Sequence, residues 1–230
     1  MHRSYPTLQS DPSTWGYRLA HGLAYVVSPL VWPPLLYGLV PAHFGAPPAE
    51  IAAIVLIATL FFVLLPLAYV LSLIRRRRVA SLEIRERQAR TVPFLVGVAS
   101  SIVAVVLLYR TGTTAIGLVT ALGVCHVANL MLVVAINLRW KISVHTTTLA
   151  GFVSVLLFVA LTWPDPSGTG AAPLLRPAPT LLLLPLVPVM MWARVRTGAH
   201  TKMQVAAGAL LGALLPFAEL ALMHAAGLLD

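Results

Sequence analysis

The chain has 230 residues, of which 59% are hydrophobic and only 10% charged, and its mean hydropathy is +0.88. Soluble domains carry about a quarter charged residues, so this composition excludes a soluble globular enzyme and equally a disordered or coiled-coil protein. Sixteen Lys and Arg stand against seven Asp and Glu, a formal charge of +9. In a membrane-protein composition this excess indicates loop cations on one membrane side rather than a nucleic-acid partner.

The apolar runs predict the membrane spans. A helix needs about 20 apolar residues to cross a bilayer, and continuous rather than alternating runs favour helices over barrel strands. We expect spans at 19–40, 51–74, 92–109, 115–138, 144–163, 177–193 and 204–228. The sixth holds Pro179, Pro185 and Pro188, so we expect either a kink there or a start nearer Leu174. The sequence predicts an all-α transmembrane helical bundle of about six to seven helices, one domain over 1–230 with a polar N-terminal segment 1–17.

The basic residues predict the orientation. Seven spans place the N-terminus and the loops after spans two, four and six on one membrane side. That side collects fourteen Lys and Arg, whereas the other receives only Arg110 and Arg176. The positive-inside bias therefore predicts a multi-pass protein of the cell membrane, of the bacterial plasma-membrane type, with a cytoplasmic N-terminus. The run Arg75–Arg78 directly ends the second span and is typical of an anchor at anionic headgroups.

Three polar segments follow spans two, four and six, at 85–93, 139–145 and 194–202. Each carries cations, and the last two add His145 and His200 at the start of the next helix. Forked arginine donors, lysine and helix N-termini suit a phosphate, and two histidines could divide nucleophilic attack and proton transfer. The spacing alone equally fits ordinary interfacial cations beside two polar helix starts.

The third segment carries the strongest resemblance, which is to the type 2 phosphatidic acid phosphatase superfamily. That family has a Ser-Arg-x5-His-x3-Asp motif, and Arg194 and His200 stand at its spacing. Gln204 occupies the aspartate position and Ala193 the serine position, whereas Gly208 falls where a glycine commonly follows. The chain resembles a divergent bacterial branch of this family.

The other two family motifs are partly present. Of Pro-Ser-Gly-His, the chain has Ser143 and His145, with Lys141 just upstream as a local cation. Of Lys-x6-Arg-Pro, it has Arg85 in the lysine position and Pro93, with Val92 in place of the arginine. Either Arg87 or Arg90 could supply the missing cation.

The resemblance implies the role of each residue. His200 would be the nucleophile that forms a phosphohistidine, and His145 the general acid. Gln204 would hold the nucleophilic ring without supplying the charge of a carboxylate. The remaining members would bind the substrate phosphate: Arg85, Arg90, Lys141, Ser143 and Arg194.

Other polar residues have plainer readings. His126 and Asn129 lie inside the fourth predicted span, where we expect helix-to-helix hydrogen bonds. Gly208 and Gly212 form a small-xxx-small step that predicts a close helix contact. No histidine pair has zinc-ligand spacing, and acidic residues are too scarce for the magnesium sites of prenyltransferases. We therefore expect no metal and no organic cofactor.

The resulting hypothesis is a membrane phosphatase that hydrolyses a lipid phosphate or diphosphate through a phosphohistidine. Its partners would be a phospholipid or isoprenoid phosphate and the surrounding membrane lipids, with the lipid tail entering between helices. The alternative is a non-catalytic relative that binds or transports an anionic lipid, which Gln204 favours. A small transporter is disfavoured because the sequence shows no internal repeat.

Overall fold

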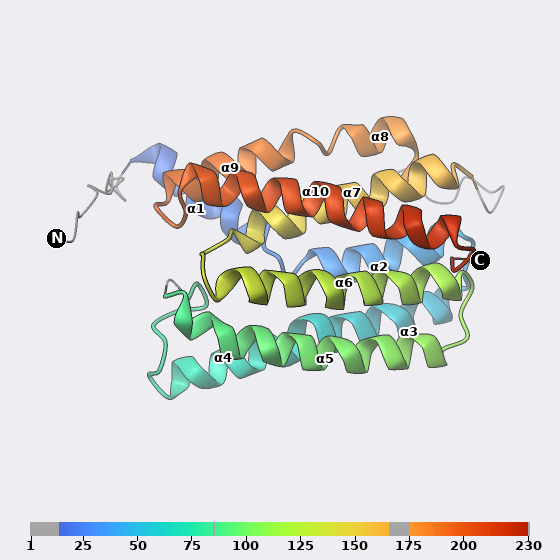
Figure 1. The fold of residues 1–230 in the computed structure, drawn as a ribbon, viewed down its shortest axis with the longest axis horizontal. Coiled ribbons are helices and arrows are strands. Elements are labelled where there is room, and N and C mark those ends of the chain that lie inside the picture. The colour runs from blue at the N-terminus through green and yellow to red at the C-terminus, as the bar shows by residue number, and fades with distance from the viewer. Residues whose placement is uncertain (1–13, 85, 166–174, 230) are drawn as a thin grey trace.

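The computed structural model describes residues 14–84, 86–165 and 175–229, and these form an all-helical bundle without strands. Six of its helices are long and apolar enough to cross a membrane, which makes the chain a multi-pass membrane protein and confirms the predicted fold class. The helices lie roughly parallel to one axis, and successive spans run in opposite directions (Figure 1). The elements are α1 (Trp15–Val26), α2 (Trp32–His43), α3 (Pro48–Ala58), the π-helical η1 (Thr59–Leu64), α4 (Leu65–Arg75), the 3-10 turn η2 (Gln88–Arg90), α5 (Thr91–Arg110), α6 (Ile116–Asn137), α7 (Val144–Thr162), α8 (Pro177–Leu181), α9 (Leu186–Arg196) and α10 (Lys202–Ala225).

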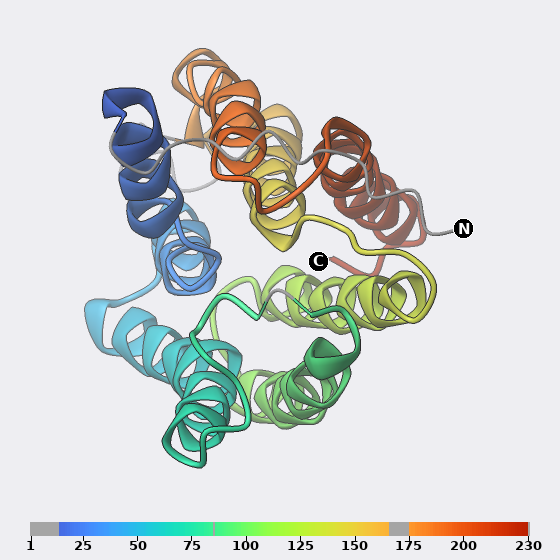
Figure 2. The same ribbon diagram turned by 90° about the vertical axis from the view of Figure 1, so that its left-hand side faces the viewer.

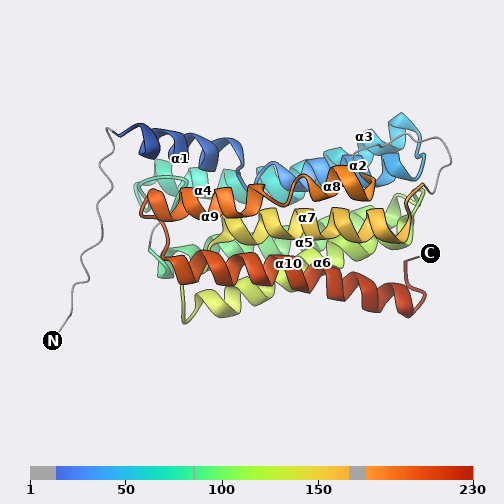
Figure 3. The ribbon, with the colours of Figure 1, turned by 90° about the horizontal axis from the view of Figure 1, so that it is seen from above.

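The first predicted span, 19–40, is not one helix, and that prediction is wrong. It is divided into α1 and α2, which follow one another along the bundle (Figures 1 and 3). Pro29 lies in the connection, and Pro33 and Pro34 stand in the first turn of α2. Proline is tolerated in a first helical turn but breaks a helix interior, so these residues separate the two pieces.

Two other spans are irregular for the same reason. The sixth is interrupted between α8 and α9, which confirms the expected kink. The second is continuous over Pro48–Arg75 but includes the π-helical segment η1, which ends two residues before Pro66. Pro66 has no N–H to donate, and in a regular α-helix its ring would clash with the carbonyl of Phe62, which lies in η1.

Helix α7 lies at the centre of the bundle. Of its most apolar 18-residue stretch, 72% is buried, against 22–33% for the other five spans. The end-on view shows α7 with α9 and α10 on one side and α2 and α6 nearby (Figure 2). Residues at the start of α7 are therefore held by the best-packed helix of the protein.

The contact between α7 and α10 is close because glycines line it. A Cβ atom on Gly212 would lie 2.1 Å from the carbonyl oxygen of Thr147, and one on Gly208 would lie 2.5 Å from Thr146 Oγ1. The expected close helix contact at this small-xxx-small step is confirmed. It fixes how the N-terminal ends of α7 and α10 lie relative to one another.

The three polar segments lie at one end of the bundle, as the alternation of spans predicts. The connections α4–α5, α6–α7 and α9–α10 gather at the end where α1 begins, and the chain finishes at the other (Figures 1 and 3). Helix α1 packs against α9 at this end.

Candidate functional site

The polar segments converge on one group of side chains, which we call the cationic cluster: Arg90, Lys141, Arg194, His145 and His200. The charges of Lys141, Arg194 and Arg90 act on the His200 ring. Those of Arg194 and Arg90 act on His145, whose ring also interacts with the backbone of Ala24 in α1. Cations predicted from three separate loops thus share one site. Arg85, also predicted for it, lies outside the described residues.

Arg194 and His200 are brought together by the turn between α9 and α10. Gly198 has a φ of +66°, in the left-handed region that glycine adopts without strain. This turn lets the amides of Ala199 and His200 both donate to the carbonyl oxygen of Arg194, each at 3.2 Å. The six-residue spacing in the sequence therefore closes into a compact loop with both side chains buried.

Gln204 fixes the orientation of the His200 ring. Its side-chain Oε1 atom lies 3.0 Å from His200 Nδ1 and also accepts from the backbone N–H of Thr201 at 3.2 Å. The backbone N–H of Gln204 donates to Thr201 Oγ1 at 3.3 Å, and the two bonds between Gln204 and Thr201 form the capping box that begins α10. Because the backbone N–H of Thr201 can only donate, the side-chain atom of Gln204 that faces it is the oxygen. His200 must then donate from Nδ1, which leaves the lone pair on Nε2.

The His200 ring is held neutral. Burial lowers its pKa to about 3, the nearby cations Lys141, Arg194 and Arg90 act in the same direction, and the bond to Gln204 opposes them. A neutral ring whose proton is on Nδ1 has an unprotonated Nε2. A histidine that acts as a nucleophile or a general base needs this form.

This low pKa predicts a pH-dependent stability. Unfolded histidine titrates near pH 6.5, so as the pH falls below about 6.5 the unfolded chain binds a proton that folded His200 does not. The free energy of unfolding should therefore fall by about 1–2 kcal/mol between roughly pH 7 and pH 5 because of this residue. Thermal unfolding of wild type and His200→Gln over this range would measure it. Equal pH slopes in the two proteins would contradict the assignment.

Ser143 and Lys141 join the α6–α7 connection to the start of α10. The Ser143 amide donates to the carbonyl oxygen of Gln204 at 3.4 Å, and Lys141 Nζ donates to that of Ala199 at 2.8 Å. Ser143 is fully buried, and its Oγ has no hydrogen-bond partner within the described part of the chain. A buried hydroxyl without a partner is uncommon in proteins.

The structure distinguishes the two arginines considered for the first motif. Arg90 is buried within the cationic cluster, and its Nε donates to the carbonyl oxygen of Ile84 at 2.6 Å. Arg87 points instead to the end of α6, where it donates to the carbonyl oxygens of Asn137 and Leu138. The Asn137 side chain returns a bond to the Arg87 carbonyl at 3.0 Å. Arg90 therefore belongs to the site, and Arg87 fastens the α4–α5 connection.

Glu83 is a member of the site that the sequence interpretation missed. It forms an ion pair with Arg194, whose side chain is 4% exposed, and its charge also acts on His145. The signal was available: Glu83 is one of seven acidic residues, and it lies between Arg78 and the first motif. Its Oε1 atom accepts from Nη2 of Arg194 and so engages one of the donors of this guanidinium.

Neutralising Glu83 should strengthen anion binding. Bonds to charged groups contribute about 1.5–3 kcal/mol, so Glu83→Gln should raise the affinity for inorganic phosphate or vanadate roughly tenfold. Phosphate-induced thermal stabilisation of the purified protein measures this effect. Glu86→Gln, an exposed change in the same segment, is the matched control and should alter nothing. Weaker phosphate binding by Glu83→Gln would show that Glu83 assists the anion rather than competing with it.

The intramembrane polar residues have structural partners. Asn129 donates from Nδ2 to Glu219 Oε2 at 2.6 Å, which links α6 to α10 and confirms the expected helix-to-helix hydrogen bond. His126 packs its ring against Phe62, with 4.7 Å between centroids. Glu219 was not recognised from the sequence.

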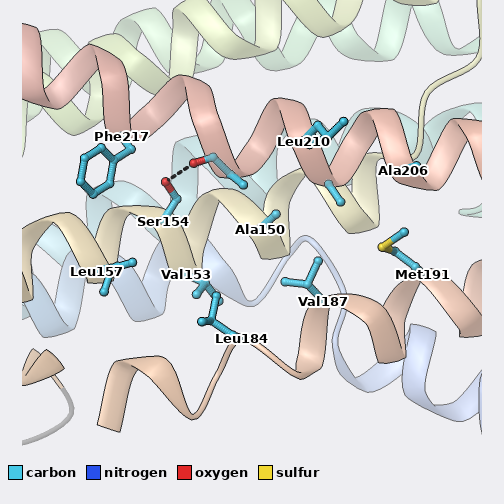
Figure 4. A pocket seen from close by; sticks show the side chains of 12 residues that line it. Ala150, Val153, Ser154, Leu157, Leu184, Val187, Met191, Ala206, Leu210 and Phe217 are labelled. Atoms are coloured by element: carbon cyan, nitrogen blue, oxygen red, sulfur yellow. Dashed lines mark hydrogen bonds between the residues drawn. The ribbon is translucent and has the colours of Figure 1, made fainter. Parts of the chain in front are cut away.

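An apolar groove of about 390 Å³ lies on the membrane-spanning part of the bundle between α7, α9 and α10 (Figure 4). In the described ranges, no group of three His, Cys, Asp or Glu side chains is placed to hold a metal ion.

No protein-family model, no curated protein and no solved structure matches this chain.

Proposed function

We propose that the protein is a membrane phosphatase that hydrolyses a lipid phosphate or diphosphate through a phosphohistidine. The observation that carries the proposal is the state of His200: a buried, neutral ring with Nδ1 bonded to Gln204 and Nε2 unprotonated, surrounded by Arg90, Lys141 and Arg194. The resemblance of the three polar segments to the type 2 phosphatidic acid phosphatases supports the same chemistry.

The first half-reaction transfers the phosphoryl group to the protein. Arg90, Lys141 and Arg194 hold the phosphate oxygens, and Nε2 of His200 attacks phosphorus. The bond between phosphorus and the lipid oxygen breaks, and His145 gives a proton to the departing alkoxide. His145 enters this step as an imidazolium, a form that the negative charge of the bound phosphate favours, and leaves it as a neutral imidazole. Nδ1 of His200 keeps its proton throughout and donates it in a hydrogen bond to Gln204 Oε1.

The second half-reaction releases phosphate. His145, now without its proton, takes one from a water molecule as that water attacks the phosphohistidine. The N–P bond breaks, and the electron pair returns to Nε2 of His200. Gln204 orients the ring but supplies no negative charge for the cationic intermediate, so we expect a slower enzyme than one with a carboxylate there.

The site is proposed to face the cytoplasmic leaflet of the cell membrane. The charge bias supports this orientation, since fourteen of the sixteen Lys and Arg fall on the N-terminal side in the seven-span alternation. Cys125, the single cysteine, is buried, so the labelling of an introduced cysteine can be measured with little labelling of Cys125. Ser81→Cys should react with impermeant reagents only from the cytoplasm and Thr111→Cys only from outside; the reverse pattern would overturn the orientation.

Phosphate release tests the function directly. Purified protein is incubated with a panel of lipid monophosphates and diphosphates, and free phosphate is measured for wild type and Arg194→Leu. Release by wild type, with a much higher KM in the variant, supports the phosphatase.

The alternative function is the binding or transport of an anionic lipid without hydrolysis. The neutral Gln204 at the carboxylate position favours it. Absence of phosphate release from every lipid, together with lipid binding that Arg194→Leu removes, would replace the phosphatase by this function.

A further inference from the structure

The two histidines of the cationic cluster have different electrostatic surroundings. Within the described part of the chain, the charges that act on His200 are all cationic. Arg194 and Arg90 also act on His145, but so does the carboxylate of Glu83. Two titratable groups whose surroundings differ in this way are suited to different roles in proton transfer.

Glu83 is held at the cluster by the segment that carries it. Arg90 is buried, and its Nε donates to the carbonyl oxygen of Ile84 at 2.6 Å, which fastens the residue next to Glu83. The Glu83 carboxylate forms an ion pair with the buried side chain of Arg194. A carboxylate in this position partly neutralises a cation that would otherwise repel a proton on His145.

Of the acidic residues in the described ranges, Glu83 is the one that supplies negative charge to this site. Glu50 and Asp165 lie at the opposite end of the bundle, where α3 begins and α7 ends (Figure 1). Glu219 is bonded to Asn129 in the membrane-spanning part, and the Glu86 side chain is exposed. The charge of Glu83 therefore has no substitute among these residues.

The His145 ring has a further partner in the backbone of Ala24, to which it is hydrogen-bonded. Ala24 stands in the last turn of α1, where carbonyl oxygens lack intrahelical partners, so the carbonyl accepts and the ring donates. A proton for a leaving oxygen must then come from the other ring nitrogen. While the bond to Ala24 is kept, His145 can act as an acid only with both nitrogens protonated, and a nearby negative charge stabilises this imidazolium.

We propose that Glu83 is a positioning residue for proton transfer, whose carboxylate stabilises the imidazolium form of the general acid His145. The proton passes from His145 to the lipid alkoxide, and the ring regains one from the water that attacks the phosphohistidine. Glu83 itself neither gains nor loses a proton. This role rests on the proposed function, but the interaction between Glu83 and His145 can also be measured without catalysis.

The first test compares two leaving groups. A lipid phosphate expels a strongly basic alkoxide that needs a proton, whereas nitrophenyl phosphate expels a weakly basic phenolate. The rate of phosphoryl transfer to the protein is measured in single turnover for wild type and Glu83→Gln. General acids contribute about a hundredfold or more, so the variant should lose at least about tenfold more rate with the lipid phosphate than with nitrophenyl phosphate.

Two variants accompany this comparison. Glu83→Asp keeps the negative charge and should retain most of the wild-type rate with the lipid phosphate. Glu86→Gln removes an exposed charge of the same segment and should behave as wild type does. Equal losses for both substrates in Glu83→Gln would mean that Glu83 only maintains the structure of the loop, and the proposal would fail.

The second test measures the protonation of His145 directly. Nitrogen NMR spectra of protein with labelled histidine and bound inorganic phosphate distinguish imidazolium from imidazole, and the signal of His145 is identified by its absence in His145→Gln. At one fixed pH, the imidazolium fraction should be larger in wild type than in Glu83→Gln. Equal fractions would overturn the inference.

The two tests separate this inference from the proposed function. A larger imidazolium fraction in wild type, without phosphate release from any substrate, would support the interaction of Glu83 with His145 and refute the phosphatase. Phosphate release together with equal imidazolium fractions would support the phosphatase and refute the role of Glu83.

Discussion

Replacing His200 by Ala should reduce phosphate release from a lipid phosphate by about a thousandfold or more. Among the described residues of this site, His200 is the one whose hydrogen bonds define an unprotonated ring nitrogen, and this nitrogen lies among cations. Removal of a nucleophile leaves only the rate enhancement that comes from binding and electrostatic stabilisation, which is why the expected loss is large. In single-turnover measurements with a lipid whose phosphate is radiolabelled, the variant protein should carry no label.

The control for this prediction is His224→Ala. His224 is exposed near the end of α10, packs against Trp163 with 5.1 Å between ring centroids, and lies at the opposite end of the bundle. Its replacement should leave the rate unchanged. Wild-type release by His200→Ala would remove the proposed mechanism even if the protein proved to be a phosphatase.

Replacing Gly212 by Val should destabilise the bundle by about 3 kcal/mol or more, the upper range of overpacking costs. The added Cβ would lie 2.1 Å from the Thr147 carbonyl oxygen and 2.9 Å from the Gly151 amide nitrogen. Both are backbone atoms of the central helix α7, so no side-chain rotation relieves the clash and the two helices must separate. Reaction of a dye with the buried Cys125 during heating would report the lowered unfolding temperature.

Gly22→Ala is the matched control for Gly212. A Cβ at Gly22 would meet nothing within 4 Å, and the residue is exposed on α1. Alanine in a helix interior is favoured over glycine by about 0.5–1 kcal/mol, so this variant should be as stable as wild type or slightly more stable. An unfolding temperature of Gly212→Val equal to that of the control would mean that α7 and α10 are not in this contact.

The sequence predicted those features that follow from chain direction and local spacing. Consecutive spans alternate in direction, so 85–93, 139–145 and 194–202 had to lie on one side. The four-residue step from Gly208 to Gly212 places both on one face of α10. The six-residue spacing of Arg194 and His200 needed only the turn at Gly198.

What the sequence left undetermined depends on packing between distant segments. The pairing of Glu83 with Arg194 joins residues 111 positions apart, and that of Asn129 with Glu219 joins residues 90 apart. Neither has a local signature. The division of 19–40 into α1 and α2 was missed for a different reason, because hydropathy outweighed the local effect of Pro29, Pro33 and Pro34.

The double use of Gln204 Oε1 has a consequence for when the ordering of the site takes place. The same oxygen accepts from the N-cap amide of α10 and from the His200 ring. The ring therefore loses its rotational freedom when the helix forms, not when a ligand binds. The entropy of orienting the ring belongs to folding, and binding can proceed without it, which is the general advantage of preorganisation. It also means that residue 204 cannot be changed to adjust the histidine alone, because any replacement is at the same time a change to the first turn of α10.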